Sequence, residues 1–435
     1  MKVLEAEKNV GINTFLTSFK GTSGKLRTIP EDFVVNEISV YPPEKKDGKF
    51  TIADVSATNW ETNLLVRALS NWLHISRQRV GFAGTKDKRA KTTRLMSFYK
   101  VKIDDLSNIK LKDVEINNIY RSDKPVKIGN LIGNKFEVIV RNINDTCKKD
   151  IQNIHKSLEE NGGFPNYFGI QRFGIVRPIT HIVGKHILNG DFQKAVMTYV
   201  ANPIKGEDKE TYNLRDKLQK NLDFAEALKN YPDILTFEKA MLNKLVVHPQ
   251  DSIGALKQLP KNLLTMFVYA YQSYLFNKII SERIKHKLPL NKAVEGDIIL
   301  PIRKGIFDEK GILVTNSNIE KVNLQISKKK AAVSGVLFGS DSVFSKGEMG
   351  EIEHKLIKAE KIDPRDFIIP EIPNISSSGA RRPIIGTVKD FDYRLLDDEL
   401  NKNQKALMLK FELLKGCYAT SFLREFMKTN DIKNY

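Results

Sequence analysis

The stretch RTIPEDFVVNEISV (27–40) combines a proline turn with a run of apolar and β-branched residues, which predicts a strand directly after the turn. A second strand is predicted over KFTIADVSA (49–57). Apolar residues then recur at helical spacing over 64–73, so a helix follows, and Thr58 or Asn59 is its expected cap. The first part of the chain is therefore predicted to form two strands followed by a helix.

The same signals recur further along the chain. Strands are predicted over 93–101, 134–142, 295–301 and 333–340, and helices over 150–163, 261–286, 403–413 and 419–429. The interval 175–385 is long enough to form a domain of its own, and 435 residues exceed the usual size of a single core. We therefore expect two domains.

The composition favours a polyanionic partner. The chain has 70 lysines and arginines against 52 acidic residues, a net charge of +18, which suits RNA, DNA or an anionic membrane. The most apolar window, LLTMFVYAYQSYLF (263–276), is too short to span a bilayer and predicts a buried helix. No convincing basic amphipathic helix or lipidation motif is present, so we expect no membrane partner.

Cysteine usage suggests a reducing compartment. The two cysteines, Cys147 and Cys417, lie far apart, and no Cys-x-x-Cys pair exists. This pattern argues against a disulfide framework and against a cysteine zinc site. The first ten residues, MKVLEAEKNV, lack the apolar core of a signal peptide. We therefore expect a cytoplasmic protein.

Two stretches resemble ligand-binding motifs but lack the residues or the spacing that such motifs require. GTSGK (21–25) lacks the upstream glycine of a phosphate-binding loop, and Leu26 replaces the Ser or Thr that would hold magnesium. His181 and His186 are five residues apart with no acidic residue between them, a poor spacing for two metal ligands on one helix face. We therefore predict neither a metal nor a nucleotide cofactor.

The loop GFAGTKDKRAKTT (81–93) places one carboxylate, Asp87, among several cations. An ordinary exposed turn is one interpretation of it. In the other, Gly81 and Gly84 allow the backbone to approach a ligand closely, and the cations favour the ionised carboxylate and neutralise nearby phosphates. An ionised carboxylate suits nucleophilic or electrostatic work. The residues alone leave both interpretations open.

Two further stretches are candidate binding segments. PNYFGIQRFG (165–174) is either an aromatic-rich turn that packs the core or a base pocket, in which an aromatic face stacks on a flipped nucleobase. Asn166 and Gln171 each offer a donor and an acceptor, which suits uracil. The paired arginines Arg381 and Arg382 in SSSGARRPI are a candidate phosphate clamp, although paired surface arginines alone are weak evidence.

Five motifs in order resemble those of the tRNA pseudouridine synthase D (TruD) family: PEDFVVNE (30–37), AGTKDK (83–88), NYFGIQRFG (166–174), SGARRP (378–383) and YATSFLRE (418–425). The resemblance covers nearly the whole chain. It implies an RNA pseudouridine synthase that isomerises a uridine in tRNA, most often at position 13, without metal or organic cofactor. No obligate protein partner is evident. A non-catalytic RNA-binding protein on the same fold is the alternative, and a metal-dependent nuclease is disfavoured because no carboxylate cluster accompanies Asp87.

The resemblance also implies roles for individual residues. Asp87 is the catalytic aspartate, acting either by attack on the nucleotide or by removing a ribose proton. Phe168 stacks on the target uracil and Asn166 helps to hold it. The remaining expected substrate-binding residues are Lys25, Lys86, Gln171, Arg381 and Arg382.

The fold expected from the resemblance is α+β. A pseudouridine synthase core with a mixed, largely antiparallel sheet and flanking helices is expected over 1–174 and 386–435, interrupted by an inserted α/β domain over 175–385. The C-terminal motif departs from the family pattern, because Leu414 stands where proline is usual and Cys417 where serine is common.

Overall fold

The structure, a computed structural model, describes residues 2–143, 147–303 and 306–435. The chain divides into two compact units. Unit 1 comprises Met1–Leu16 and Pro165–Ile385, and unit 2 comprises Thr17–Phe164 and Gly386–Tyr435. This division differs from the predicted one, which placed residues 1–16 and 165–174 in the same domain as 17–164.

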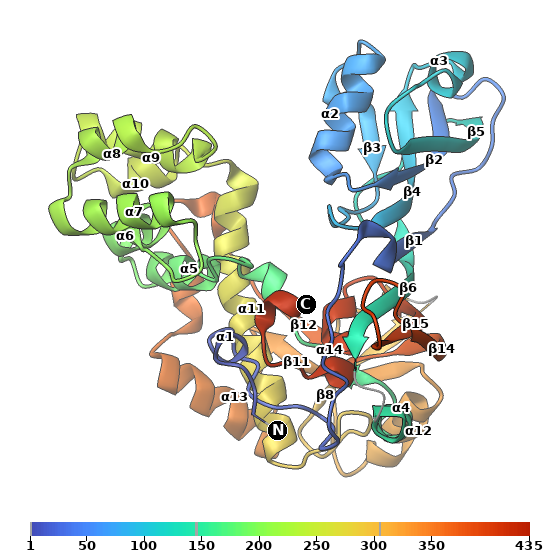
Figure 1. The fold of residues 1–435 in the computed structure, drawn as a ribbon. Coiled ribbons are helices and arrows are strands. Elements are labelled where there is room, and N and C mark those ends of the chain that lie inside the picture. The colour runs from blue at the N-terminus through green and yellow to red at the C-terminus, as the bar shows by residue number, and fades with distance from the viewer. Residues whose placement is uncertain (1, 144–146, 304–305) are drawn as a thin grey trace. The chain divides into compact units, whose positions relative to one another are not determined.

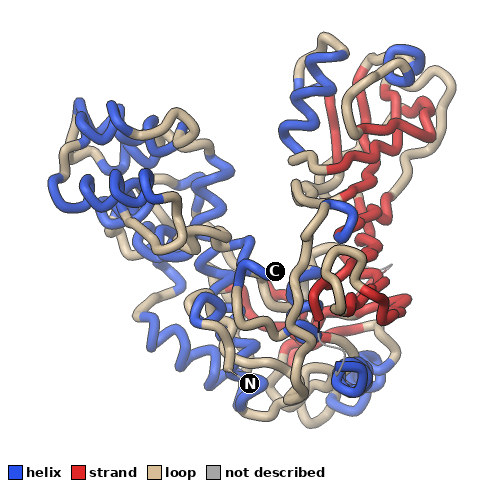
Figure 2. Tube along the Cα trace, in the orientation of Figure 1, coloured by secondary structure: helices blue, strands red, loops and turns tan. Residues whose placement is uncertain are grey.

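A mixed sheet forms the framework of unit 2, as Figure 2 shows. Its strands are β1 (Phe33–Ser39), β2 (Phe50–Thr58), β3 (Val80–Phe82), β4 (Lys91–Tyr99), β5 (Val114–Ser122), β6 (Leu131–Ile143), β14 (Val388–Asp397) and β15 (Lys405–Leu414). The order is β14-β15-β6-β1-β4-β2-β5, with β3 beside β4. Only the β1–β4 pair is parallel among the registered strand pairs of the described residues of this sheet. The expected mixed, largely antiparallel sheet of an α+β fold is therefore confirmed.

Short helices flank this sheet. They are η1 (Pro30–Asp32), α2 (Thr62–Trp72), η2 (Arg77–Arg79), α3 (Ile103–Ser107), α4 (Lys148–Glu160), α14 (Ala419–Met427) and η7 (Ile432–Asn434). The predicted cap of α2 is wrong. The Glu61 carboxylate accepts the Leu64 amide at 3.0 Å, whereas Asn59 lies in the left-handed region with φ +62°.

The helix predicted over 403–413 is also wrong, because this segment forms strand β15. Leu407, Leu409, Phe411 and Leu413 are buried and alternate with less buried residues, which is the period of a strand. Alanine, leucine, lysine and glutamate favour helices intrinsically, but pairing with β6 on one side and β14 on the other outweighs that preference.

Unit 1 is mainly helical. Its helices are α1 (Glu5–Lys8), η4 (Ile170–Arg172), α5 (Thr180–Leu188), α6 (Phe192–Ala201), α7 (Lys209–Asn221), α8 (Phe224–Asn230), α9 (Thr236–Val247), α10 (Ser252–Leu256), α11 (Lys261–Lys285), α12 (Ile319–Ser327), α13 (Gly347–Glu360), η5 (Pro364–Phe367) and η6 (Pro373–Ile375). An antiparallel sheet, ordered β10-β8-β11-β12 with β9 beside β8, comprises β8 (Ile298–Arg303), β9 (Ile306–Phe307), β10 (Ile312–Leu313), β11 (Ala331–Leu337) and β12 (Ala380–Pro383).

Helix α11 is the centre of unit 1. Helices α6 to α10 gather at one end of it, as Figure 1 shows, and α5 and α13 pack along it. The close packing against α5 requires Gly184, since a Cβ there would lie 2.1 Å from the Phe267 carbonyl oxygen. The predicted buried helix is thus confirmed. No helix in the described ranges is both long and apolar enough to cross a membrane.

Polar side chains of α11 fix the two segments that the prediction had placed elsewhere. The Asn277 amide nitrogen donates to the carbonyl oxygens of Val10 (2.9 Å) and Phe168 (3.0 Å), and its oxygen accepts the Phe168 amide at 2.8 Å. Ser281 donates to the Gly11 carbonyl at 3.0 Å. These buried bonds explain why residues 1–16 and 165–174 belong to unit 1. The chain passes between the units three times, once between Leu16 and Thr17 and then within each of the short paired strands β7 (Phe164–Pro165) and β13 (Ile385–Gly386).

Candidate functional site

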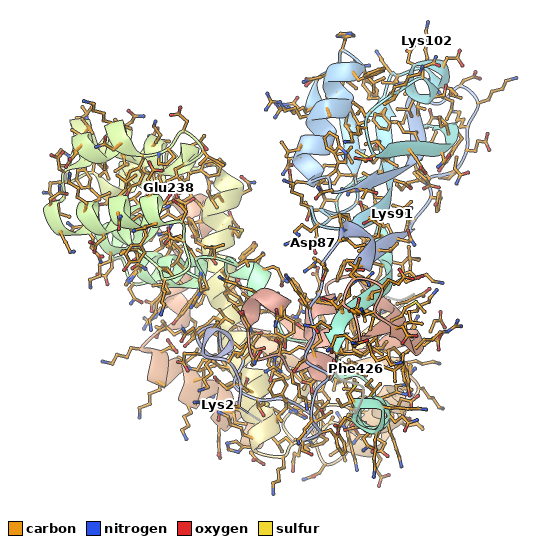
Figure 3. All side chains as sticks on the ribbon, viewed as in Figure 1. Lys2, Asp87, Lys91, Lys102, Glu238 and Phe426 are labelled. Carbon is orange, nitrogen blue, oxygen red and sulfur yellow. The ribbon has the colours of Figure 1, made fainter. Side chains whose placement is uncertain are left out.

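The carboxylate of Asp87 is exposed and ion-paired. Arg27 Nη2 donates to Asp87 Oδ2 at 2.7 Å, and the exposed fractions of the two side chains are 11% and 56% respectively. In Figure 3, the part of unit 2 that contains strands β1 to β5 has Asp87 and Lys91 towards one end and Lys102 at the other. Asp87 is therefore accessible to a ligand while its partner is largely covered.

Arg27 is held from three sides. Its guanidinium carbon lies 4.0 Å from the centre of the Phe33 ring, and its carbonyl oxygen accepts from Arg89 Nη2 at 3.0 Å. Burial lowers the pKa of Arg27, and the Asp87 charge opposes that change. The sequence does not single out Arg27, because other cations lie close to Asp87 in the chain, whereas Arg27 lies 60 residues earlier. Its position three residues before the PEDF motif is the only signal that could have found it.

Lys86 turns inward beside Asp87. Its Nζ lies 2.6 Å from Glu37 Oε2, and only 5% of the Lys86 side chain and none of the Glu37 side chain is exposed. Burial lowers the pKa of Lys86, while Glu37 opposes this. The structure therefore places Lys86 as an anchor of the loop, not at its surface as the expected role in substrate binding would require.

The first turn of α2 anchors the same loop. Thr62 Oγ1 accepts the Lys86 amide at 2.8 Å and also accepts from Arg94 Nη1 at 2.8 Å. Arg94 is buried, which lowers its pKa to about 10. Among the loop cations, Lys88, Arg89 and Lys91 remain exposed.

Lys25 lies beside strand β6. It forms a backbone bridge with Arg141, and its side chain is exposed. Arg27, two residues further along, makes the contact with Asp87. Arg27 thus supplies a basic group at Asp87, and the expected role of Lys25 in substrate binding stays a prediction.

In unit 1 the structure brings together Asn166, Phe168 and Arg382. Arg382 Nη2 donates to Asn166 Oδ1 at 2.8 Å, and its guanidinium carbon lies 4.0 Å from the centre of the Phe168 ring. The Asn166 amide nitrogen donates to the Pro383 carbonyl at 3.0 Å. The oxygen and the nitrogen of the Asn166 amide thus both have partners within unit 1. The bond to the oxygen helps to hold the Arg382 guanidinium against the Phe168 ring.

Phe168 itself is rigidly mounted. It is 8% exposed, packs edge-on against Phe276 with 5.5 Å between ring centres, and has its backbone bracketed by Asn277. It also lines a cavity of about 410 Å³. Gln171 lies in the adjacent helix η4 and is half-buried.

The two arginines of the SGARRP motif have different environments because neighbouring residues of a strand point to opposite faces. Arg381 Nη2 donates to the buried Glu353 carboxylate at 3.1 Å, Nε donates to Ser334 Oγ at 2.9 Å, and Nη1 donates to the Val343 carbonyl at 2.6 Å. Burial lowers its pKa. The geometry does not present Arg381 to a phosphate, so the clamp expected of the pair is not formed by both residues.

No group of three or more potential metal ligands occurs in the part of the chain that the structure describes. His181 packs between the rings of Phe173 and Tyr274, at 5.3 and 5.1 Å between centres. The sequence-predicted residues fall into two groups. Asp87, Lys25 and Lys86 belong to unit 2, and the others belong to unit 1.

Comparisons with known proteins agree on one family. The family model described as tRNA pseudouridine synthase D (TruD) matches residues 9–426. Proteins named as probable tRNA pseudouridine synthase D are similar over nearly their whole length. The one from Methanococcoides burtonii is 42% identical, covering 99% of each chain, and the one from Methanosarcina mazei is 41% identical, covering 100% of each. A crystal structure described as TruD from Methanosarcina mazei matches with a TM-score of 0.88 and 40% identity over 100% of both chains.

Proposed function

The chain belongs to the tRNA pseudouridine synthase D family, and we propose that it isomerises a specific uridine in tRNA to pseudouridine, with Asp87 as the catalytic residue. The observation that carries this proposal is the exposed Asp87 carboxylate fixed by a covered guanidinium at 2.7 Å. By family resemblance the target is position 13. The proposed setting is the cytoplasm, where tRNA is the partner and neither a metal nor an organic cofactor takes part.

The reaction breaks the bond between uracil N1 and ribose C1′ and forms one between C5 and C1′. The hydrogen lost from C5 is balanced by the one gained at N1, so no co-reactant is consumed. Asp87 attacks the nucleotide or removes a ribose proton, and both roles need an ionised carboxylate in a fixed place. The charge-assisted bond from Arg27 supports both requirements.

Phe168 is the proposed platform for the target uracil. Taking a uridine out of its stack costs a few kcal/mol, and stacking on an aromatic ring returns about 1–3 kcal/mol. Arg382 covers one face of the Phe168 ring, so a base would use the other face. Asn166 supports this platform by orienting Arg382. The net charge of +18 supports binding to the RNA backbone.

The test compares the wild-type protein with Asp87→Asn on uridine-labelled tRNA transcripts in EDTA, followed by digestion to nucleosides. Pseudouridine should form with wild type alone, and both proteins should bind tRNA within about twofold of each other because one charge in a basic loop changes few phosphate contacts. Near-wild-type turnover by Asp87→Asn would disprove the assignment of Asp87. If wild type bound tRNA but formed no pseudouridine from any transcript, the non-catalytic alternative would stand.

A further inference from the structure

The cavity beside Phe168 lies wholly within unit 1. Helix η4 contributes Arg172, and helix α11 contributes Tyr269, Gln272 and Ser273. Leu337 at the end of β11 and residues 376–380, which lead into β12, line another side. Residues 269, 272 and 273 share one face of α11 because they are three and four positions apart. The volume, about 410 Å³, falls within the usual range for small-ligand sites, roughly 300–1,000 Å³.

Arg172 is the charged group of this cavity. Its Nε is shielded from solvent and has no hydrogen-bond partner among the described residues. None of the described residues that line the cavity carries a carboxylate. The Arg172 side chain as a whole is half-buried at the cavity wall, and an arginine fork fits a phosphate well. The wall is therefore suited to an anionic ligand.

The opposite walls offer an aromatic face and fixed polar groups. Tyr269 is 43% exposed although it is a large aromatic residue on a helix of which more than half is buried. Gln272 is held by hydrogen bonds to the Phe338 carbonyl and, at 2.9 Å, to Ser377 Oγ. Ser377 Oγ also accepts the Gly379 amide at 3.4 Å. The cavity thus combines a stacking surface with a rigid polar wall and a cation, which is the chemistry of a nucleotide site.

We propose that this cavity is a subsite for a nucleotide next to the target uridine, in which Arg172 binds the phosphate and Tyr269 stacks on the base. The inference rests on the proposed function, because Phe168 forms a wall of the cavity and is also the proposed platform for the target base. The subsite gives unit 1 a part in choosing which uridine is modified, beyond holding that uridine.

The first experiment measures RNA binding without catalysis. Arg172→Met, Arg172→Lys and the matched control Lys257→Met are each made in the Asp87→Asn background and titrated with the tRNA transcript. Lys257 is exposed on unit 1 and does not line the cavity. Arg172→Met should weaken binding about tenfold, as expected for a lost charge-assisted hydrogen bond, and Arg172→Lys should recover part of it. Lys257→Met should change binding by less than about twofold.

The second experiment locates the phosphate. In the mapped tRNA target, phosphates flanking the uridine are replaced one at a time by uncharged methylphosphonates, and pseudouridine formation is followed in single turnovers. At one position the replacement should slow wild type about tenfold and should slow Arg172→Met no further. Removal of the base next to the target uridine should slow pseudouridine formation by wild type. The same removal should slow Tyr269→Leu no further.

The outcomes separate the subsite from the proposed function. If wild type formed pseudouridine but Arg172→Met and Tyr269→Leu behaved like Lys257→Met in both experiments, the subsite would be disproved and the function would stand. If no protein formed pseudouridine while Arg172→Met still bound tRNA about tenfold more weakly than the control, the nucleotide site would stand and the function would fall. Thermal unfolding of each variant identifies any that fail to fold. If Arg172→Met fails to fold, the binding of tRNA by Arg172→Lys, which keeps the positive charge, is compared with that of the control instead.

Discussion

The ion pair between Arg27 and Asp87 determines where the proposed catalytic carboxylate lies. Replacing Arg27 with methionine keeps most of the contact with Phe33 but removes the charged bond. We expect kcat/KM to fall about 100-fold, because a displacement of about 1 Å at a reacting group costs that much. Single-turnover pseudouridine formation measures the effect. Arg27→Lys should restore part of the rate, and equal rates for Met and wild type would contradict this positioning role.

The buried ion pair between Lys86 and Glu37 is expected to affect the stability of the fold. Glu37→Gln leaves the Lys86 ammonium buried without its counter-charge, which should cost about 3–5 kcal/mol in the free energy of unfolding. The double variant Glu37→Gln, Lys86→Met should lose less than the sum of the two single variants. Trp60 and Trp72 are the two tryptophans of the chain and both lie in unit 2, so urea unfolding followed by tryptophan fluorescence reports on this unit. Additive losses would show that the pair is not coupled.

At the scale of single residues, the sequence points to candidates that sit in a recognisable motif, but it does not show contacts that join distant segments. The catalytic role of Asp87 stays a prediction, and Asp87 was singled out by its loop together with the family motif around it. Its partner Arg27 was not, because nothing in the sequence states which of many cations folds against a carboxylate 60 residues away. The sequence predicts Lys86 and Arg381 as ligands of the substrate, yet each has a buried carboxylate partner that only the fold reveals.

Among the elements, helix α5 carries a titratable group that links pH to stability. Burial lowers the pKa of His181 to about 4. Between pH 6.5 and about 4 the unfolded chain therefore binds a proton that the folded protein does not, so stability is full above pH 6.5 and decreases as the pH falls. The loss should reach at most about 3 kcal/mol. Hydrogen exchange of α5 and α11 amides, corrected for intrinsic rates, measures it.

His181→Phe should remove most of this pH dependence while keeping the packing with Phe173 and Tyr274. The matched control is His248→Phe, because His248 is exposed in the same unit. An unchanged slope in His181→Phe would show that another group causes the acid sensitivity of these helices.

Most strands and long helices followed from periodicity, since β1, β2, β4, β6 and α11 lie where the alternating or helical patterns placed them. Strand β15 did not, because its residues favour a helix in isolation and become a strand only between β6 and β14. The prediction of the α2 cap was wrong because of a single side chain. A glutamate side chain took the position that the usual short polar caps were expected to fill.

For the whole molecule, the charge of +18 predicts tRNA binding that weakens steeply with salt. Lys88→Ala and Lys91→Ala remove exposed cations beside Asp87, and each should reduce the slope of log affinity against log salt by about 0.7–0.9. Lys102→Ala is the control, since Figure 3 shows Lys102 at the opposite end of the same lobe. Binding measured from 50 to 200 mM KCl tests this, and an equal change in all three variants would contradict a local contact.

Two neighbouring strands of the unit 2 sheet, β6 and β15, are translated far apart in time. Strand β6 ends at Ile143 and its neighbour β15 begins at Lys405, so roughly 260 residues are translated between them. At about 5–20 residues per second the ribosome needs about 13–50 s to make that stretch. During this time β1 covers one edge of β6 and the other edge has no partner strand. The nascent chain therefore carries an open sheet edge through much of its synthesis, and its yield in the cell depends on keeping that edge from pairing with other chains.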